Sequence, residues 1–174
     1  GITRVRGAFE MVRAVHKLDV KLIIAGPMED HQLKKDLEQT PGWGNVIYLG
    51  SVAREKVFEV METSSLGLLL YHPEPNHTDA QPNILFEYMA VGLPVLASNF
   101  DLWHNIVEVC GTGACVNPQD VAAIHRSILK MLQAHDELLQ MGERGRIAID
   151  EKLNWGAEEK KLFSLYEDII KSKK

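Results

Sequence analysis

The chain has 174 residues, of which 45% are hydrophobic and 25% are charged, proportions typical of a single globular domain. Its 24 acidic residues outnumber 19 basic ones, and the formal net charge of −5 argues against a general nucleic-acid-binding surface. No run of about 18 apolar residues is present, so the sequence predicts neither a membrane span nor a signal peptide.

Short apolar runs alternate with amphipathic patterns along most of the chain. Buried strands are expected over residues 20–25, 46–49, 66–71, 95–97 and 113–116. Helices are expected near residues 8–15, 29–39, 54–63, 82–91, 102–109, 118–132, 136–153 and 155–170, with a loop over 72–81. Strands that are apolar on both faces favour a parallel sheet covered on both sides. The sequence therefore predicts one doubly wound, Rossmann-like α/β domain over residues 1–174, with the sheet and its helices in 1–133 and extra helices in 134–174.

Several local features of the second half carry predictions of their own. Asn117 is expected to cap a helix that begins at Pro118. Cys110 and Cys115 are expected to be free thiols that pack as small hydrophobic side chains near a strand, in a reducing compartment. The tail Lys171–Lys174 is expected to fray. Core packing is expected for apolar positions that recur at helical spacing near the C-terminus: Trp155, Leu162, Phe163 and Tyr166.

The most informative stretch covers residues 79–98 and reads D-A-Q-P-N-I-L-F-E-Y-M-A-V-G-L-P-V-L-A-S. Pro82 suits the first turn of a helix, Gly92 suits its C-terminal cap, and a buried strand follows. Backbone N–H groups at such a helix start attract phosphate. The carboxylates of Asp79 and Glu87 could accept hydrogen bonds from sugar or ribose hydroxyls. This stretch therefore predicts a site for a phosphorylated sugar or nucleotide.

The segment F-E-Y-M-A-V-G-L-P-V-L-A-S closely resembles the donor-site signature of the family 4 (group 1) retaining glycosyltransferases of GT-B fold. In that signature, two acidic residues separated by seven others precede an A-x-G-x-P-V turn. Asp79 and Glu87 have this spacing, with Asp where the family more often has Glu. The resemblance extends over nearly the whole chain. It implies the C-terminal, donor-binding half of such an enzyme, without the N-terminal acceptor domain, and with the family's central strand before Gly1 absent or reduced to a stub.

The resemblance also assigns roles to individual residues. Glu87 would bind the ribose hydroxyls of the nucleotide, and Asp79 would lie near the transferred sugar. Arg6 would stabilise the departing diphosphate, with Arg4 as a weaker companion, because a guanidinium matches phosphate oxygens in a bidentate way. Further donor contacts are expected from the backbone of two turns: Ala80, Gln81, Pro82 and Asn83 beside the sugar and diphosphate, and Ser51 and Val52 beside the nucleobase. The structural alternatives are a solvent-facing Glu87, an ordinary loop aspartate at position 79 and solvated arginines.

No protein-held metal or cofactor is expected, because the resembled family binds its donor without one. A metal cluster of His72, Glu74, His77 and Asp79 on one loop is the weaker alternative. The expected partners are a UDP-, GDP- or ADP-linked sugar, and a saccharide or lipid-linked acceptor reached through the absent domain. No nucleic acid is expected as a partner. The expected setting is cytoplasmic, with a peripheral location at the inner membrane as an option for the full-length enzyme.

The resemblance implies sugar transfer from a nucleotide sugar with retention of the anomeric configuration, in polysaccharide biosynthesis. The chain by itself is expected to bind donor weakly and to transfer nothing. Two alternatives stay open. One is a GT-B-type sugar-nucleotide epimerase, and the other is a non-catalytic α/β nucleotide-binding module.

Overall fold

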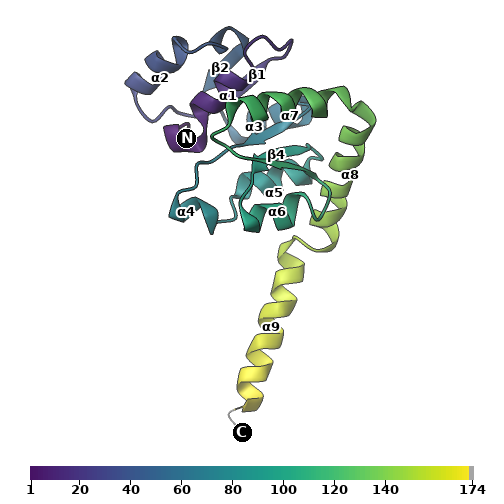
Figure 1. Cartoon of the computed structure of the whole chain (residues 1–174). Helices are drawn as coiled ribbons and strands as arrows, with labels where there is room; N and C mark the ends of the chain where they lie inside the picture. Colours follow the sequence, from purple (N-terminus) through teal and green to yellow (C-terminus); the bar gives the residue numbers. More distant parts are fainter. Residues whose placement is uncertain (173–174) are drawn as a thin grey trace.

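Strands and helices alternate along the computed structural model, which describes residues 1–172 (Figure 1). The first part of the chain forms the 3₁₀ turn η1 (Arg4–Arg6), α1 (Ala8–Ala14), β1 (Leu22–Ala25), α2 (His31–Glu38), the 3₁₀ turn η2 (Trp43–Asn45), β2 (Val46–Gly50) and α3 (Arg54–Thr63). The second part forms β3 (Gly67–Leu69), α4 (Pro75–Thr78), α5 (Asn83–Ala90), β4 (Val95–Ser98), α6 (Asp101–Val107), β5 (Gly113–Val116), α7 (Val121–Gln133), α8 (His135–Glu151) and α9 (Trp155–Ser172).

All strand pairs between these named strands are parallel, as the sequence predicted. β1 pairs with β2, with Leu22 opposite Val46. β3, β4 and β5 form a second group in that order, with Gly67 opposite Val95 and Val95 opposite Gly113. Parallel neighbours need a crossover connection, and the helices between the strands supply it. The fold is therefore the α/β, Rossmann-like arrangement that was expected.

The two groups of strands are separated by a cavity of about 650 Å³. Residues of β1 and of β3 line it, Ile24 and Leu68 among them, together with Ile2 from the start of the chain. Ile2 forms a single parallel bridge with Met28, just beyond the end of β1. Among the described residues before η1, this bridge is the one strand-like pairing.

Both faces of β4 are buried, which explains why three of its four residues are apolar. All four residues of the strand, Val95–Ser98, are buried. Leu96 belongs to the core cluster formed with α1, α2 and α7, whereas Val95 and Ala97 belong to the cluster formed with α5 and α6. Alternate side chains of a strand point to opposite faces. Figure 1 accordingly shows α7 on one side of β4, and α5 and α6 on the other.

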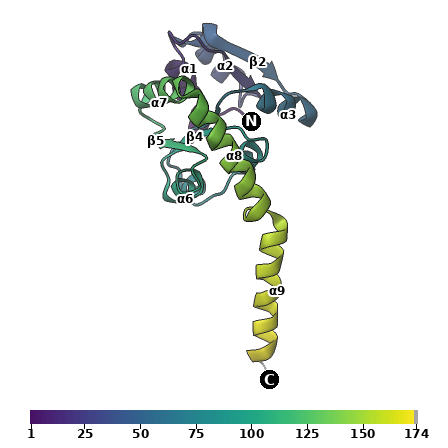
Figure 2. The ribbon, with the colours of Figure 1, turned by 90° about the vertical axis from the view of Figure 1, so that its right-hand side faces the viewer.

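The last helix differs most from the sequence-based expectation. Figures 1 and 2 show α9 projecting away from the body of the domain. The four side chains expected in the core are exposed to 72, 42, 60 and 57% in the order Trp155, Leu162, Phe163 and Tyr166, so that prediction is wrong. Helical periodicity identifies an apolar face but does not say what covers it. The fraying predicted at the tail falls partly on residues 173–174, which lie outside the described residues.

The structure also corrects three predictions about where helices begin. α7 begins at Val121, where the Asp120 side chain accepts a hydrogen bond from the Ala123 N–H at 2.9 Å. Asn117 therefore does not cap this helix, and its side chain instead accepts from the Gln119 N–H at 3.0 Å. Pro82 is the N-cap of α5, one residue before the helix proper. The predicted loop over 72–81 contains the short helix α4, begun by Pro75.

Both cysteines are free and partly buried, as predicted. None of the described helices combines the length and the apolar character needed to cross a membrane.

Candidate functional site

A cavity of about 340 Å³ opens where the η1 turn faces the segment that leads into α5. Its lining consists of Arg6, Tyr71, Asn76, His77, Ala80, Pro82, Asn83, Ile84 and Trp103. Four residues predicted from the sequence meet here, namely Arg6, Ala80, Pro82 and Asn83. The cavity lies just beyond the carboxyl end of β3, which is where open parallel α/β sheets bind their ligands.

Arg6 is held at the mouth of this cavity by the fold around Gly7. Gly7 ends η1 in the left-handed conformation, with φ of 74°, and packs against the backbone carbonyl of Leu70. The Arg6 guanidinium lies 5.2 Å from the centroid of the Tyr71 ring and donates a hydrogen bond to the Gly1 carbonyl oxygen at 3.2 Å. Burial raises the pKa of Tyr71, an effect that the charge of Arg6 partly offsets. Arg6 thus presents a fixed positive charge beside an aromatic ring that is neutral at physiological pH.

The opposite wall of the cavity is formed by Trp103, which contacts Tyr71. The sequence predicted neither residue for this site. Trp103 of α6 is fully buried, and its indole N–H donates to the Ala80 carbonyl oxygen at 2.7 Å. The Trp103 ring also contacts Tyr71 edge-on, with centroids 5.5 Å apart. A buried indole N–H requires an acceptor, and here this requirement fixes the turn before α5. No motif marks Trp103, because only its tertiary contacts reveal its role.

The backbone N–H groups of the turn before α5 are not equally available to bind a ligand. The Ala80 N–H donates to the His77 carbonyl oxygen at 3.3 Å, so it already takes part in the turn. Pro82 has no N–H, and Asn83 opens α5. Among the predicted amide donors, Gln81 and Asn83 therefore lie at the start of the helix, where the helix dipole favours an anion.

Glu87 has a partner that the sequence did not reveal. Its carboxylate lies 3.0 Å from the Arg54 guanidinium, and its side chain is 27% exposed against 72% for Arg54. Arg54 begins α3, and its guanidinium also lies 5.2 Å from the centroid of the Phe58 ring. The described lining of the cavity includes neither Glu87 nor Asp79, which is the C-cap of α4. The binding roles expected of these two acids stay predictions.

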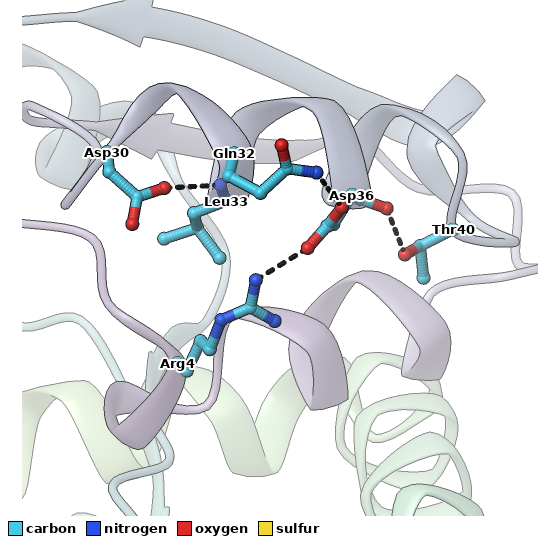
Figure 3. Close-up of polar contacts among 6 residues, drawn as sticks. All are labelled: Arg4, Asp30, Gln32, Leu33, Asp36 and Thr40. Carbon is cyan, nitrogen blue, oxygen red and sulfur yellow. Dashed lines mark hydrogen bonds and ion pairs between the residues drawn. The ribbon is translucent and has the colours of Figure 1, made fainter.

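Arg4 points toward α2 rather than toward the cavity (Figure 3). It forms an ion pair with Asp36, which also accepts a hydrogen bond from Gln32 at 2.7 Å. The hydrogen bonds from Arg4 and then from Gln32 lower the pKa of Asp36. The companion role predicted for Arg4 is therefore without support from its position, because its guanidinium is engaged with a carboxylate.

Ser51 and Val52 follow the carboxyl end of β2, on the connection to α3. The two ends of the first strand pair are tied there, since the Gly26 N–H donates to the Gly50 carbonyl oxygen at 2.7 Å. The nucleobase contact predicted for Ser51 and Val52 stays a prediction.

The loop over residues 72–81 does not assemble its four potential metal ligands within the described residues. The His72 imidazole instead lies 3.2 Å from the carboxylate of Glu10 on α1. The His77 Nδ1 faces the His72 carbonyl oxygen at 3.1 Å, and its ring lies 4.9 Å from that of Tyr71. The His77 imidazole therefore forms part of the cavity wall, whereas the His72 imidazole contacts α1.

Comparisons with known proteins identify the family and the fold of this chain. The family model described as glycosyl transferases group 1 matches residues 1–148. The fold is similar to that of sucrose-phosphate synthase from Thermosynechococcus elongatus, with a TM-score of 0.81 and 22% identity over 97% of this chain and 43% of that one. It is also similar to Anabaena HepE in complex with UDP, with a TM-score of 0.78 and 15% identity over 95% and 46% of the two chains.

A third similar structure is the C-terminal domain of a group 1 glycosyl transferase, LpcC from Francisella tularensis, with a TM-score of 0.75 and 18% identity. That match covers 88% of this chain and 83% of the domain. No curated protein matches the sequence significantly. The chain spans less than half the length of sucrose-phosphate synthase and of HepE. The chain belongs to the glycosyl transferases group 1 family, and its fold corresponds to part of a GT-B glycosyltransferase.

Proposed function

We propose that this chain is the nucleotide-sugar-binding half of a retaining glycosyltransferase. The observation that carries the proposal is that Arg6 and the first residues of α5 line the same cavity. A guanidinium and a helix N-terminus are two independent sources of positive potential, and both suit a diphosphate. The Anabaena relative was solved with UDP, which supports a nucleoside diphosphate as the ligand class.

The chemical task of such a half is to stabilise the leaving group. When the bond between the sugar and the diphosphate breaks, negative charge builds up on the departing phosphate oxygen. Arg6 and the start of α5 would stabilise that charge where it develops, which lowers the barrier. Asp79 would orient the sugar and Glu87 the ribose, so that the acceptor meets the anomeric carbon correctly.

The acceptor is proposed to bind to the remainder of the full enzyme. This chain spans less than half the length of sucrose-phosphate synthase and of HepE. We therefore expect the isolated chain to bind its donor weakly and to show no transfer, whereas transfer at full rate by the isolated chain would contradict this division of labour.

The test is calorimetric titration of the chain with UDP, GDP and ADP and with their sugar conjugates. One nucleotide is expected to bind saturably, and Arg6→Ala is expected to weaken it by about tenfold or more, as for loss of a hydrogen bond to a charged group. Arg13→Ala is the matched control, because Arg13 lies on α1 against Phe9 and does not line the cavity. Equal losses in the two variants would refute the assignment of Arg6.

The same titration separates the proposed roles of the acids. Glu87→Ala should weaken binding of the nucleotide, because the carboxylate is proposed to hold the ribose. Asp79→Asn should weaken binding of the sugar conjugate more than binding of the free nucleotide. Interconversion of the donor sugar without any acceptor would favour the epimerase, and indifference to both changes would favour the binding module.

A further inference from the structure

A second group of chemically reactive side chains lies between α6 and the neighbouring strand β5. His104 and Glu108 are four residues apart at the end of α6, so they share one face of the helix. Cys115 lies on the neighbouring strand β5. One ligand atom from each of the three residues lies within 4.8 Å of the others.

The three side chains are organised by direct contacts. One Glu108 oxygen lies 3.2 Å from the His104 Nδ1, and the other accepts a hydrogen bond from the Cys115 N–H at 2.8 Å. The strand that carries Cys115 is fixed by its pairing with Ala97 of β4. The helix that carries His104 is fixed by its buried face, which includes Trp103. The cluster therefore connects two well-anchored elements.

The donor set is one nitrogen, one oxygen and one sulfur, and this combination selects among metals. Mg²⁺ and Ca²⁺ prefer oxygen ligands alone, whereas Zn²⁺ accepts imidazole, carboxylate and thiolate together. Bonds of about 2.0–2.3 Å in a tetrahedral site place ligand atoms about 3.4 Å apart. The side chains of His104 and Glu108 are 51 and 39% exposed, so they are free to close the remaining distance.

The surroundings also favour a cation. The cluster lies at the carboxyl end of α6, where the helix dipole is negative, and Glu108 is the C-cap. The hydrogen bond from the Cys115 N–H to the second Glu108 oxygen would orient that carboxylate in the manner typical of supported metal ligands. We propose that His104, Glu108 and Cys115 form a zinc-binding site that joins α6 to β5 and leaves a fourth coordination position open.

The test is titration of the chelator-treated, reduced chain with Co²⁺ as a spectroscopic probe, followed by displacement with Zn²⁺. One equivalent of Co²⁺ is expected to bind, with an absorption band from thiolate-to-cobalt charge transfer that Zn²⁺ abolishes. Cys115→Ser should remove that band, whereas Cys110→Ser, a change at the other free thiol, should retain it. His104→Ala should lower Zn²⁺ affinity by about tenfold or more, and His135→Ala, a change at an exposed histidine on α8, should not.

A second measurement, of the melting temperature, does not depend on the absorption of Co²⁺. Zn²⁺ should raise the melting temperature of the unaltered chain and of Cys110→Ser, but not that of Cys115→Ser. Circular dichroism of each metal-free variant establishes that it is folded. The proposal is overturned if less than half an equivalent of metal binds, if the charge-transfer band persists in Cys115→Ser, or if all variants bind Zn²⁺ alike.

Discussion

Replacement of Gly7 by alanine gives the sharpest test of how the fold positions Arg6. Gly7 has φ of +74°, and a Cβ built on it would lie 2.0 Å from the carbonyl oxygen of Leu70. Leu70 is fully buried, so its backbone cannot give way without disturbing the core. We therefore expect Gly7→Ala both to destabilise the domain and to displace the neighbouring Arg6.

The magnitude has two parts. Forcing a residue with a Cβ into the left-handed region costs about 1–2 kcal/mol. Relieving the contact with Leu70 by a backbone shift adds about 1–3 kcal/mol, the usual cost of overpacking. The free energy of unfolding should thus fall by about 2–5 kcal/mol, a large share of the roughly 5–15 kcal/mol typical of a domain.

Urea denaturation followed by circular dichroism measures this fall in the free energy of unfolding. Alanine variants of two other glycines separate the conformational cost from the cost of the contact with Leu70. Gly50 has φ of +65° but nothing within 4 Å of its Cβ position, so Gly50→Ala reports the conformational cost alone. Gly44 also has nothing within 4 Å and has no positive φ, so Gly44→Ala should change stability by less than about 1 kcal/mol.

The expected order of destabilisation is Gly7→Ala, then Gly50→Ala, then Gly44→Ala. If Gly7→Ala costs no more than Gly50→Ala, the close approach to Leu70 does not exist in solution. If it costs as expected but leaves nucleotide affinity unchanged, Arg6 does not depend on this turn, and the proposed anchoring of the cation is refuted.

Three other changes test separate parts of the structure. Trp103→Phe removes the hydrogen bond to Ala80 and should lower the free energy of unfolding by about 1–3 kcal/mol, with weaker nucleotide binding by calorimetry. Burial, and then the charge of Glu108, raise the pKa of the Cys115 thiol to about 12. In metal-free protein, its alkylation at pH 8 should therefore be far slower than that of an unfolded thiol, and should accelerate about tenfold per pH unit. Phe163→Glu on α9 should leave the free energy of unfolding within about 0.5 kcal/mol of that of the unaltered chain, because the Phe163 side chain is 60% exposed.

Each of these has a contradicting outcome. Trp155→Phe is the control for the buried tryptophan, and equal losses in both would mean that the bond to Ala80 contributes nothing. Alkylation of Cys115 at the rate of the urea-unfolded chain would show that the thiol is not shielded. A loss of 2 kcal/mol or more in Phe163→Glu would show that α9 packs against the domain in solution.

The raised pKa of Cys115 also predicts that the free energy of unfolding falls as the pH rises into the alkaline range. An acid whose pKa is raised on folding binds its proton more tightly in the folded state, so the folded chain holds more protons between the unfolded and folded pKa values. Tyr88 behaves in the same way, because burial raises its pKa to about 12. The contributions of the protonated Cys115 thiol and Tyr88 hydroxyl to the free energy of unfolding are fully present below about pH 9. They are lost as the pH rises toward 12. Stability that rises over this interval would contradict the burial of these groups.

The sequence by itself determined the parts of this protein that depend on local patterns. The spacing of apolar residues and the turn residues beside them predicted the observed bounds of β5 and α3. This spacing depends on only a few consecutive side chains. Apolar runs on both faces predicted a covered parallel sheet, and the motif over residues 79–98 identified the family that the comparisons confirm. The resemblance likewise pointed to Arg6, Ala80, Pro82 and Asn83, which line one cavity.

Only the tertiary structure decided which side chains face one another across large sequence separations. Trp103 with Ala80, Arg54 with Glu87, and Arg4 with Asp36 are pairs separated by more than 20 residues, and no local pattern connects them. The apolar face of α9 shows the same distinction, because its periodicity is written in the sequence whereas its exposure is not. Local chemistry fixes which surface a segment offers, and the packing of the whole chain fixes what that surface meets.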